Sequence, residues 1–292
     1  MAAETKDFLI LSVEDRTAKN GKPFKLVKAR DEEGKDFDLY IWKDFDKLTP
    51  IPENVYSLTA DFNSEFPELK DMVISTRKVT EFVGSIYSLE EGLALLDSML
   101  SQITDPDFKE LNNRLFKQAI KEKFVMHVAA VRWHHTRMGA LLQHTNEVFE
   151  GAKALAKLPM YEGYIDYQTV LEGALLHDFG KLFTHDVSSI GQNSVTKFEM
   201  LAGHLSLGSE IIAKNASGLN KDKIEHLKHI IRAHHLRQDW DAVVQPATIE
   251  AYLVFVADYM SANLDRFRDT EFDEATGLGS SNGRASFVKF VY

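Results

Sequence analysis

The 292-residue sequence predicts a two-domain protein, with a small N-terminal β-barrel followed by an all-α bundle of helices. Apolar and polar residues alternate through about the first 80 residues, as in half-buried strands. From about residue 86 the apolar residues recur at the spacing of an amphipathic helix. All 11 histidines lie between His127 and His235, within the helical part. We therefore expect a β domain at 1–85, a helical domain at 86–270 and a C-terminal tail at 271–292.

The N-terminal domain shows five strand-like segments, at 7–15, 24–31, 36–42, 54–62 and 70–80. A short break, Lys43–Leu48, separates the third segment from the fourth. Five strands with such a break resemble an OB-fold barrel, whose strand face often binds oligonucleotides. We expect Phe24, Tyr40 and Trp42 to offer stacking surfaces for bases. The alternative is that these three aromatic side chains fill the barrel.

The helical domain carries clear start signals. Ser88 and Glu91 form a capping box, and Pro106 after Asp105 opens the next helix. Further segments with helical spacing lie at 138–158, 167–178, 198–216, 221–235 and 246–267. The Gly/Ser-rich residues 276–283 predict a flexible linker, and 284–292 a short terminal strand.

Composition limits the class of protein. The formal net charge of −10 argues against a protein that binds nucleic acid through its overall charge, although a local basic surface within 116–137 could compensate. The absence of cysteine excludes disulfides, thiolate zinc sites and a cysteine nucleophile. No apolar run approaches the roughly 20 residues of a membrane span. The N-terminus lacks a signal pattern, so we expect a cytoplasmic protein without membrane contact.

Ligand-type residues interrupt the apolar stretches of five predicted helices. A charged or polar side chain at a buried position is costly unless it is paired or binds a metal. The residues concerned are His144, His177, Asp178, His204, His234, His235 and Asp258. Helix bundles commonly build metal sites from inward-facing side chains on several helices, and imidazole is the most frequent metal ligand. The pattern therefore predicts a metal site in the helical domain.

The order of these residues, H…HD…D, resembles the HD-domain superfamily of metal-dependent phosphohydrolases. The segments that flank them look like YhaM-type 3′-to-5′ exoribonucleases, at 134–145, 173–181, 201–208, 230–235 and 254–267. That family also places an OB domain ahead of its HD domain. The resemblance covers most of the chain and leaves residues 270–292 unmatched.

The resemblance implies a role for each residue. The first metal ion would be bound by His144, His177, Asp178 and Asp258, and the second by Asp178, as a bridging carboxylate, with His204 and either His234 or His235. Lys181, His135 and Arg137 would contact substrate phosphate, the alternatives being a solvated helix-end cation for Lys181 and structural roles for the other two. Mixed imidazole and carboxylate ligation suits Mn²⁺, which we expect, with Fe²⁺ and Co²⁺ as alternatives.

The function implied is a 3′-5′ exoribonuclease that hydrolyses single-stranded RNA, or also single-stranded DNA, with a water activated by two metal ions. The family resemblance also implies a homo-oligomer. The first alternative is an HD phosphodiesterase or phosphohydrolase that acts on a small or cyclic nucleotide, which the net charge of −10 favours. A dinuclear-iron oxygenase is disfavoured by the OB-like domain. A non-catalytic single-strand-binding protein is disfavoured by the complete ligand set.

Overall fold

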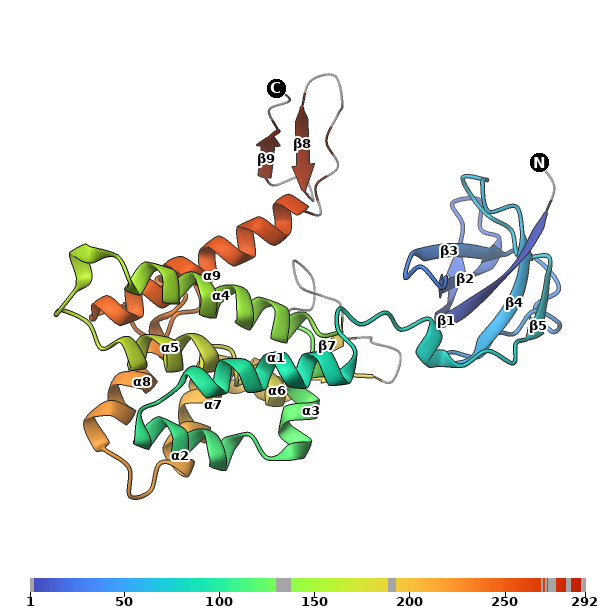
Figure 1. Ribbon diagram of the computed structural model, residues 1–292. Helices are drawn as coiled ribbons and strands as arrows, with labels where there is room; N and C mark the ends of the chain where they lie inside the picture. The colour runs from blue at the N-terminus through green and yellow to red at the C-terminus, as the bar shows by residue number, and fades with distance from the viewer. Residues whose placement is uncertain are drawn as a thin grey trace. The chain divides into compact units, whose positions relative to one another are not determined.

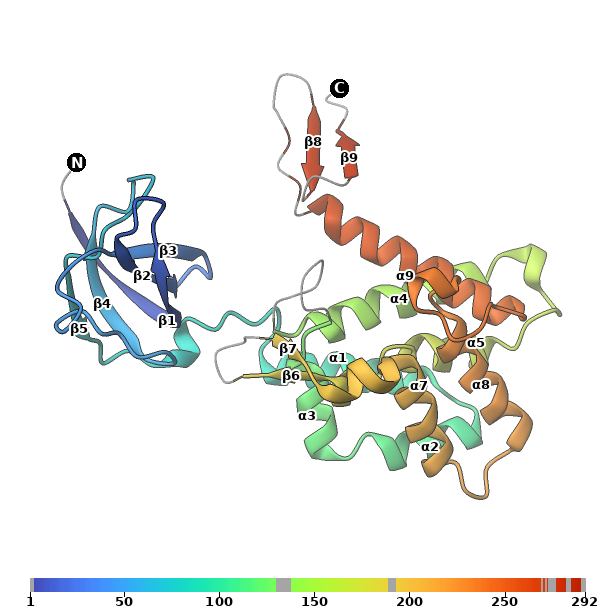
Figure 2. The same ribbon diagram turned by 180° about the vertical axis from the view of Figure 1, so that it is seen from behind.

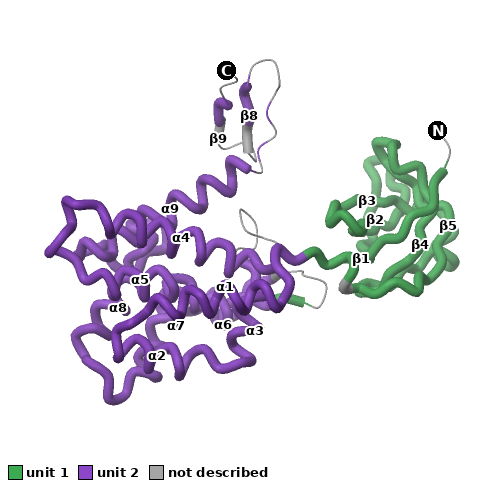
Figure 3. The backbone as a smooth tube through the Cα atoms, in the orientation of Figure 1, with its two compact units in different colours: residues 1–84, 187–192 green, residues 85–186, 193–292 purple. Residues whose placement is uncertain are grey.

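The computed structural model describes residues 3–129, 138–188, 193–268, 270, 272, 277–281 and 285–289. Its contacts divide the chain into two units, shown in Figure 3. One unit comprises residues 1–84 and 187–192, and the other comprises residues 85–186 and 193–292. Within the described ranges, no helix is both long and apolar enough to traverse a bilayer.

The N-terminal unit is a five-stranded antiparallel sheet (Figures 1 and 2). Its strands are β1 (Glu4–Thr17), β2 (Pro23–Arg30), β3 (Asp36–Ile41), β4 (Val55–Ala60) and β5 (Asp71–Ile74), in the order β3-β2-β1-β4-β5. The long strand β1 pairs with β4 through its first half and with β2 through its second, and the register shifts between Ile10 and Ser12. A register shift of this kind bends a strand, which lets β1 serve two neighbours.

The sheet closes on itself at Tyr40. The amide of Tyr40 on β3 donates to the Pro67 carbonyl at 2.8 Å, and the amide of Leu69 donates to the Tyr40 carbonyl at 2.9 Å. The edge strand β3 therefore meets the chain just before β5, as closure into a barrel requires. Inside, strand alternation fills the core: Val27 and Ala29 are buried, whereas Lys28 between them is exposed.

The second unit is built from nine α-helices within the described residues. They are α1 (Leu89–Gln102), α2 (Pro106–Leu115), α3 (Gln118–Met126), α4 (Ala140–Ala156), α5 (Tyr167–Leu176), α6 (Lys181–Thr184), α7 (Lys197–Asn215), α8 (Lys221–Ala233) and α9 (Ile249–Arg268). The predicted caps are confirmed: Ser88 accepts from the Glu91 amide, and Asp105 accepts from the amides of Asp107 and Phe108.

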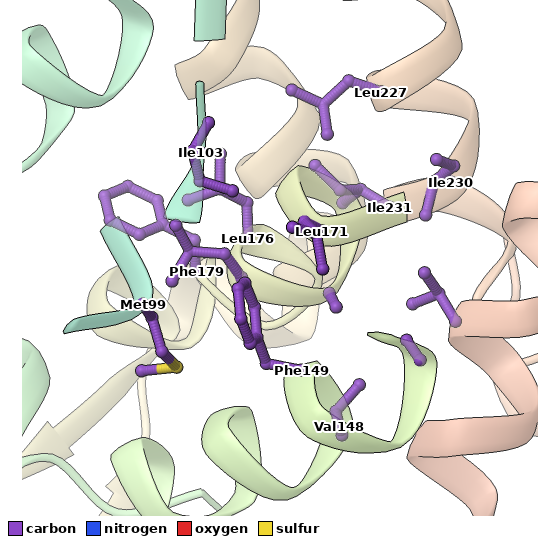
Figure 4. Close-up of a cluster of buried hydrophobic side chains, with 14 of the residues drawn as sticks. Met99, Ile103, Val148, Phe149, Leu171, Leu176, Phe179, Leu227, Ile230 and Ile231 are labelled. Atoms are coloured by element: carbon purple, nitrogen blue, oxygen red, sulfur yellow. The ribbon is translucent and has the colours of Figure 1, made fainter. Parts of the chain in front are cut away.

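Helix α5 is the central element of the bundle and packs against α4, α8 and α9. Every residue from Thr169 to Leu176 is buried. Figure 4 shows Leu171 and Leu176 of α5 among Phe149 of α4 and Ile230 and Ile231 of α8. The side chains that directly follow α5 therefore enter the interior of the unit.

The predicted fold class is confirmed, with local differences. Besides the helices, the described part of the chain after residue 85 contains two pairs of short strands, β6 (His185–Val187) with β7 (Asn193–Val195) and β8 (Leu278–Ser281) with β9 (Ala285–Val288). The prediction of a flexible linker was wrong for 278–281, because this Gly/Ser-rich segment pairs with β9, with Gly279 opposite Phe287. Helix α3 was not predicted as a separate element.

Candidate metal centre

The structure brings the seven ligand-type residues together from different helices of the second unit. His144 lies on α4 and Asp258 on α9, whereas His177 and Asp178 directly follow α5. His204 lies on α7, and His234 and His235 directly follow α8. The side chains form two groups that meet at Asp178.

The first group surrounds Oδ2 of Asp178. This oxygen lies 3.5 Å from Nε2 of His144 and 3.4 Å from Nε2 of His177. Asp258 joins the group through its Oδ1, 3.1 Å from Nε2 of His144. One ligand atom from each of His144, His177 and Asp178 lies within 4.8 Å of the others.

The second group surrounds the other oxygen, Oδ1 of Asp178. It lies 3.5 Å from Nε2 of His204 and 3.7 Å from Nε2 of His234. His235 belongs to the same group, since ligand atoms of His204, His234 and His235 lie within 4.8 Å of one another. The two oxygens of one carboxylate thus face two separate sets of imidazoles.

Each of four imidazoles has its Nδ1 next to a hydrogen-bond acceptor. Nδ1 lies 2.9 Å from Ser261 Oγ in His144, 2.8 Å from the Ala174 carbonyl in His177, 3.3 Å from Glu199 Oε1 in His204 and 2.8 Å from the Ile231 carbonyl in His234. A proton on Nδ1 leaves Nε2 with a lone pair directed at Asp178. This is the arrangement that metal-binding histidines adopt.

The central atoms need a cation. Nε2 of His144 and Nε2 of His177 lie 3.2 Å apart, and two lone pairs repel at that distance. Of the seven ligand-type residues, all of which the structure describes, four have a buried polar atom without a hydrogen-bond partner: Asp178 Oδ1, His204 Nε2, His234 Nε2 and His235 Nδ1. Buried polar atoms are rarely left unpaired. These residues therefore fit divalent cations.

Comparison with known proteins agrees with this geometry. Residues 141–263 match the model of the HD domain family. This segment is an HD domain. Over its length the chain is similar to the 3′-5′ exoribonuclease YhaM of Oceanobacillus iheyensis, at 27% identity over 90% of this chain and 85% of that protein. It is also similar to the proteins of the same name from Bacillus subtilis, at 28% identity over 88% and 84%, and Listeria innocua, at 26% over 88% and 84%. The resemblance inferred from the sequence is confirmed.

Electrostatics in the HD domain give Asp178, His234 and His235 the protonation states that metal binding requires. Burial opposes ionisation of Asp178, yet the Lys181 ammonium and His177 hold the pKa of its carboxyl well below the usual range. Burial lowers the pKa of His234 well below its ordinary value, and that of His235 to about 4. At neutral pH the carboxylate is anionic and these two imidazoles are neutral, as coordination requires.

A break in α7 places His204. Gly203 adopts φ 71° and ψ 156°, inside a segment that is otherwise helical. A positive φ of this kind suits glycine. The carbonyl of His204 also approaches Gly180 so closely that a Cβ added to Gly180 would lie 2.0 Å from it. The two glycines thus allow the turn after Asp178 and the helix with His204 to touch.

Two supporting contacts of the HD domain were not predicted. Glu199 accepts from His204, and although burial opposes its ionisation, this contact lowers its pKa to about 2. The Ser261 hydroxyl, next to His144, donates to Oε2 of Glu147 at 2.6 Å. Ser261 lies three residues after Asp258, and Glu147 lies three residues after His144. Helical spacing could therefore have revealed Ser261 and Glu147.

Lys181 is buried rather than solvated. Its Nζ lies 2.6 Å from Oδ2 of Asp178, the oxygen of the first group. His135 and Arg137, expected to contact phosphate, lie outside the described residues, as does Arg132 of the predicted basic stretch. In that stretch, Lys121 pairs with Asp97 at 2.5 Å and Lys123 donates to the Leu182 carbonyl.

The three aromatic residues predicted to stack on bases form a cluster in the N-terminal unit. The rings of Phe24 and Trp42 stack with centroids 4.7 Å apart, and those of Tyr40 and Trp42 lie nearly parallel with centroids 6.2 Å apart. Phe66, which was not predicted, meets Tyr40 edge to face at 5.5 Å. Trp42 is 38% exposed and Phe66 55% exposed, so these two do not fill the barrel.

Proposed function

We propose that the protein is a 3′-5′ exoribonuclease that hydrolyses single-stranded RNA with two divalent metal ions. The observation that carries the proposal is that the two carboxylate oxygens of Asp178 face different histidines. Oδ2 faces His144 and His177, whereas Oδ1 faces His204 and His234. Relatives that align with about nine tenths of this chain carry this activity in their names. Single-stranded DNA is a second substrate under this proposal.

When bound, two ions supply an activated water and stabilise both the attacking and the leaving oxygen of a phosphodiester. Asp178 would bridge the ions. His144, His177 and Asp258 would hold the first, and His204 with His234 or His235 the second. We propose Mn²⁺ as the metal, with Fe²⁺ and Co²⁺ as alternatives, because all three accept mixed imidazole and carboxylate ligation.

The substrate phosphate would meet Lys181. Its buried ammonium lies beside the first group, so it can bind a phosphate oxygen there without leaving the site. We also propose His135 and Arg137 as phosphate contacts. The aromatic cluster of Phe24, Tyr40 and Trp42 would hold the strand, since exposed rings stack on bases irrespective of sequence. Association of the chain into a homo-oligomer remains part of the proposal.

The decisive experiment incubates the pure protein with 5′-end-labelled single-stranded RNA and Mn²⁺. The proposal expects a ladder of products that shorten progressively from the 3′ end. Intact RNA beside a hydrolysed cyclic or small nucleotide would instead favour a nucleotide phosphodiesterase. Release of the labelled 5′ nucleotide as the first product would contradict the polarity.

A variant tests the role of Asp178. Asp178→Ala should abolish RNA hydrolysis and lower the metal content by more than one ion per chain, because the carboxylate would serve both ions. The exposed Asp46→Ala of the N-terminal unit is the matched control. Mass spectrometry counts the ions, and circular dichroism confirms the fold. Wild-type turnover by metal-replete Asp178→Ala would refute the assignment.

A further inference from the structure

Two aromatic rings lie parallel on the surface of the HD domain. Trp240 ends the short 3₁₀ turn Gln238–Trp240, and Tyr259 lies on α9. Their planes differ by 2° and their centroids are 6.0 Å apart. The side chains remain 44% and 52% exposed, respectively. Large aromatic side chains usually bury most of their surface, so a half-exposed parallel pair from separate elements needs another explanation than the core.

In the sequence, both aromatic residues lie close to candidate metal ligands. Tyr259 directly follows Asp258 of the first group. The turn with Trp240 begins at Arg237, whose amide donates to the carbonyl of His235 at 2.7 Å. The stacked rings themselves show that the turn after α8 approaches α9. The pair is thus anchored to residues of both ligand groups.

The backbone around Trp240 is strained. Leu236 and Asp241, which flank the turn, have φ values of 65° and 70°. A left-handed conformation is costly for a residue with a Cβ, and most of all for a bulky one such as leucine. Two such residues persist only where the surroundings enforce them, and they concentrate at functional sites. The turn is tied back to α8 by the Val243 amide, which donates to the Arg232 carbonyl at 2.9 Å.

A cation completes the surface. The guanidinium carbon of Arg237 lies 5.4 Å from the centroid of the Trp240 ring. Arg237 pairs with Asp239 at 2.7 and 2.8 Å, and both side chains are more than half exposed. Exposed ion pairs contribute little free energy, so a phosphate group can compete for the guanidinium. An exposed aromatic platform beside an exchangeable cation is the combination that binds single-stranded nucleic acid.

We propose that Trp240 and Tyr259, with Arg237, form a subsite for a nucleotide next to the scissile phosphodiester. The base stacks on the aromatic pair and its phosphate meets the guanidinium. This proposal rests on the proposed ribonuclease function. The competing occupant is a second copy of the chain, which would cover the pair together with neighbouring exposed residues of α9 such as Tyr252 and Val256. The cation over the ring and the attachment to both ligand groups favour the nucleotide.

The test compares full-length wild type with Trp240→Ala and Tyr259→Ala on single-stranded RNA and Mn²⁺. Loss of one stacked base should raise KM about 5- to 100-fold and leave kcat nearly unchanged, because stacking acts on binding. Trp240→Phe should restore most of the affinity. Tyr164→Ala, which removes an aromatic ring that is 77% exposed elsewhere in the unit, is the matched control and should behave as wild type.

RNA that lacks single bases near its 3′ end supplies the specific readout. On RNA without the stacked base, the KM of the wild type should rise to the KM that Trp240→Ala shows on intact RNA. The KM of Trp240→Ala should be the same on both RNAs. The subsite would be refuted if base removal and Trp240→Ala raised KM independently, or if KM were unchanged in both variants. The proposed function would stand in either case, provided that the wild type degrades RNA. A change of oligomeric state in light scattering without a change in KM would assign the pair to a second copy. A wild type that leaves RNA intact would overturn the proposed function, and the subsite with it.

Discussion

A buried acid on α5 makes the stability of the HD domain depend on pH. Glu172 is completely buried, and burial raises the pKa of its carboxyl to about 8. Asn112 Nδ2 donates to Glu172 Oε2 at 2.9 Å. Within the described part of the chain, Asn112 Oδ1 and Glu172 Oε1 have no other partner. A single hydrogen bond from a neutral amide does not offset the burial of a negative charge, so the neutral acid suits the site.

The magnitude follows from the two pKa values. The unfolded chain releases the proton near pH 4.5 and the folded chain near pH 8, so the folded protein binds more protons between these values. Stability is therefore complete below about pH 4.5, is lost as the pH rises towards 8, and is constant above that. At about 1.4 kcal/mol per pH unit, the loss amounts to about 5 kcal/mol. Water entering the site at high pH would reduce this value.

Glu172→Gln removes the titration and keeps a carbonyl oxygen that can accept the hydrogen bond from Asn112. We expect the variant to match the wild type at about pH 5 and to melt about 10 °C above it at about pH 9, since 1 kcal/mol shifts a melting temperature by about 2–4 °C. Thermal melts followed by far-ultraviolet circular dichroism at both pH values measure this. Glu210→Gln, an exposed site on α7, is the control. A difference between variant and wild type that is the same at both pH values would refute the reasoning.

Three further changes test the site and the barrel. Gly180→Ala should lose about one metal ion per chain and most activity, because the new Cβ would meet the His204 carbonyl at 2.0 Å; metal analysis that finds both ions contradicts this. Ser261→Ala should weaken metal affinity about 10- to 100-fold, because His144 loses its orienting acceptor, and metal titration that gives wild-type affinity would argue otherwise. Trp42→Ala should weaken binding of long single-stranded RNA about 5- to 100-fold without slowing hydrolysis of short RNA, as measured by fluorescence anisotropy and turnover; equal affinity would exclude the strand-binding role.

The grouping of the ligand-type residues could be predicted because each interrupts an apolar helix. Asp258 follows Val254–Ala257, and a carboxylate there requires a cationic partner. Spacing alone then indicates which helix faces meet. The start of α1 could be predicted for a similar reason, since Ser88 and Glu91 satisfy the free amides of the first turn locally.

Contacts that depend on a local break could not be predicted. In an unbroken helix, Glu199 and His204 would point about 140° apart, and only the left-handed Gly203 lets them meet. Strand β8 was missed because its pairing with β9 is not encoded in its own Gly/Ser composition. Phe66 was missed because a loop residue has no periodicity, and barrel closure at Tyr40 brings it to the cluster.

The contact of backbone with backbone at Gly180 has a consequence for sequence divergence. A Cβ added to Gly208 of α7 would lie 3.3 Å from the Gly180 amide nitrogen, so no side chain separates the two segments. The spacing between Asp178 and His204 therefore depends on main-chain atoms, whose size is the same in every protein. Core residues away from this contact, such as Leu171 and Phe149, can exchange for others of similar volume without altering that spacing. An HD domain built in this way can accumulate many substitutions in its interior and still present the same ligand geometry.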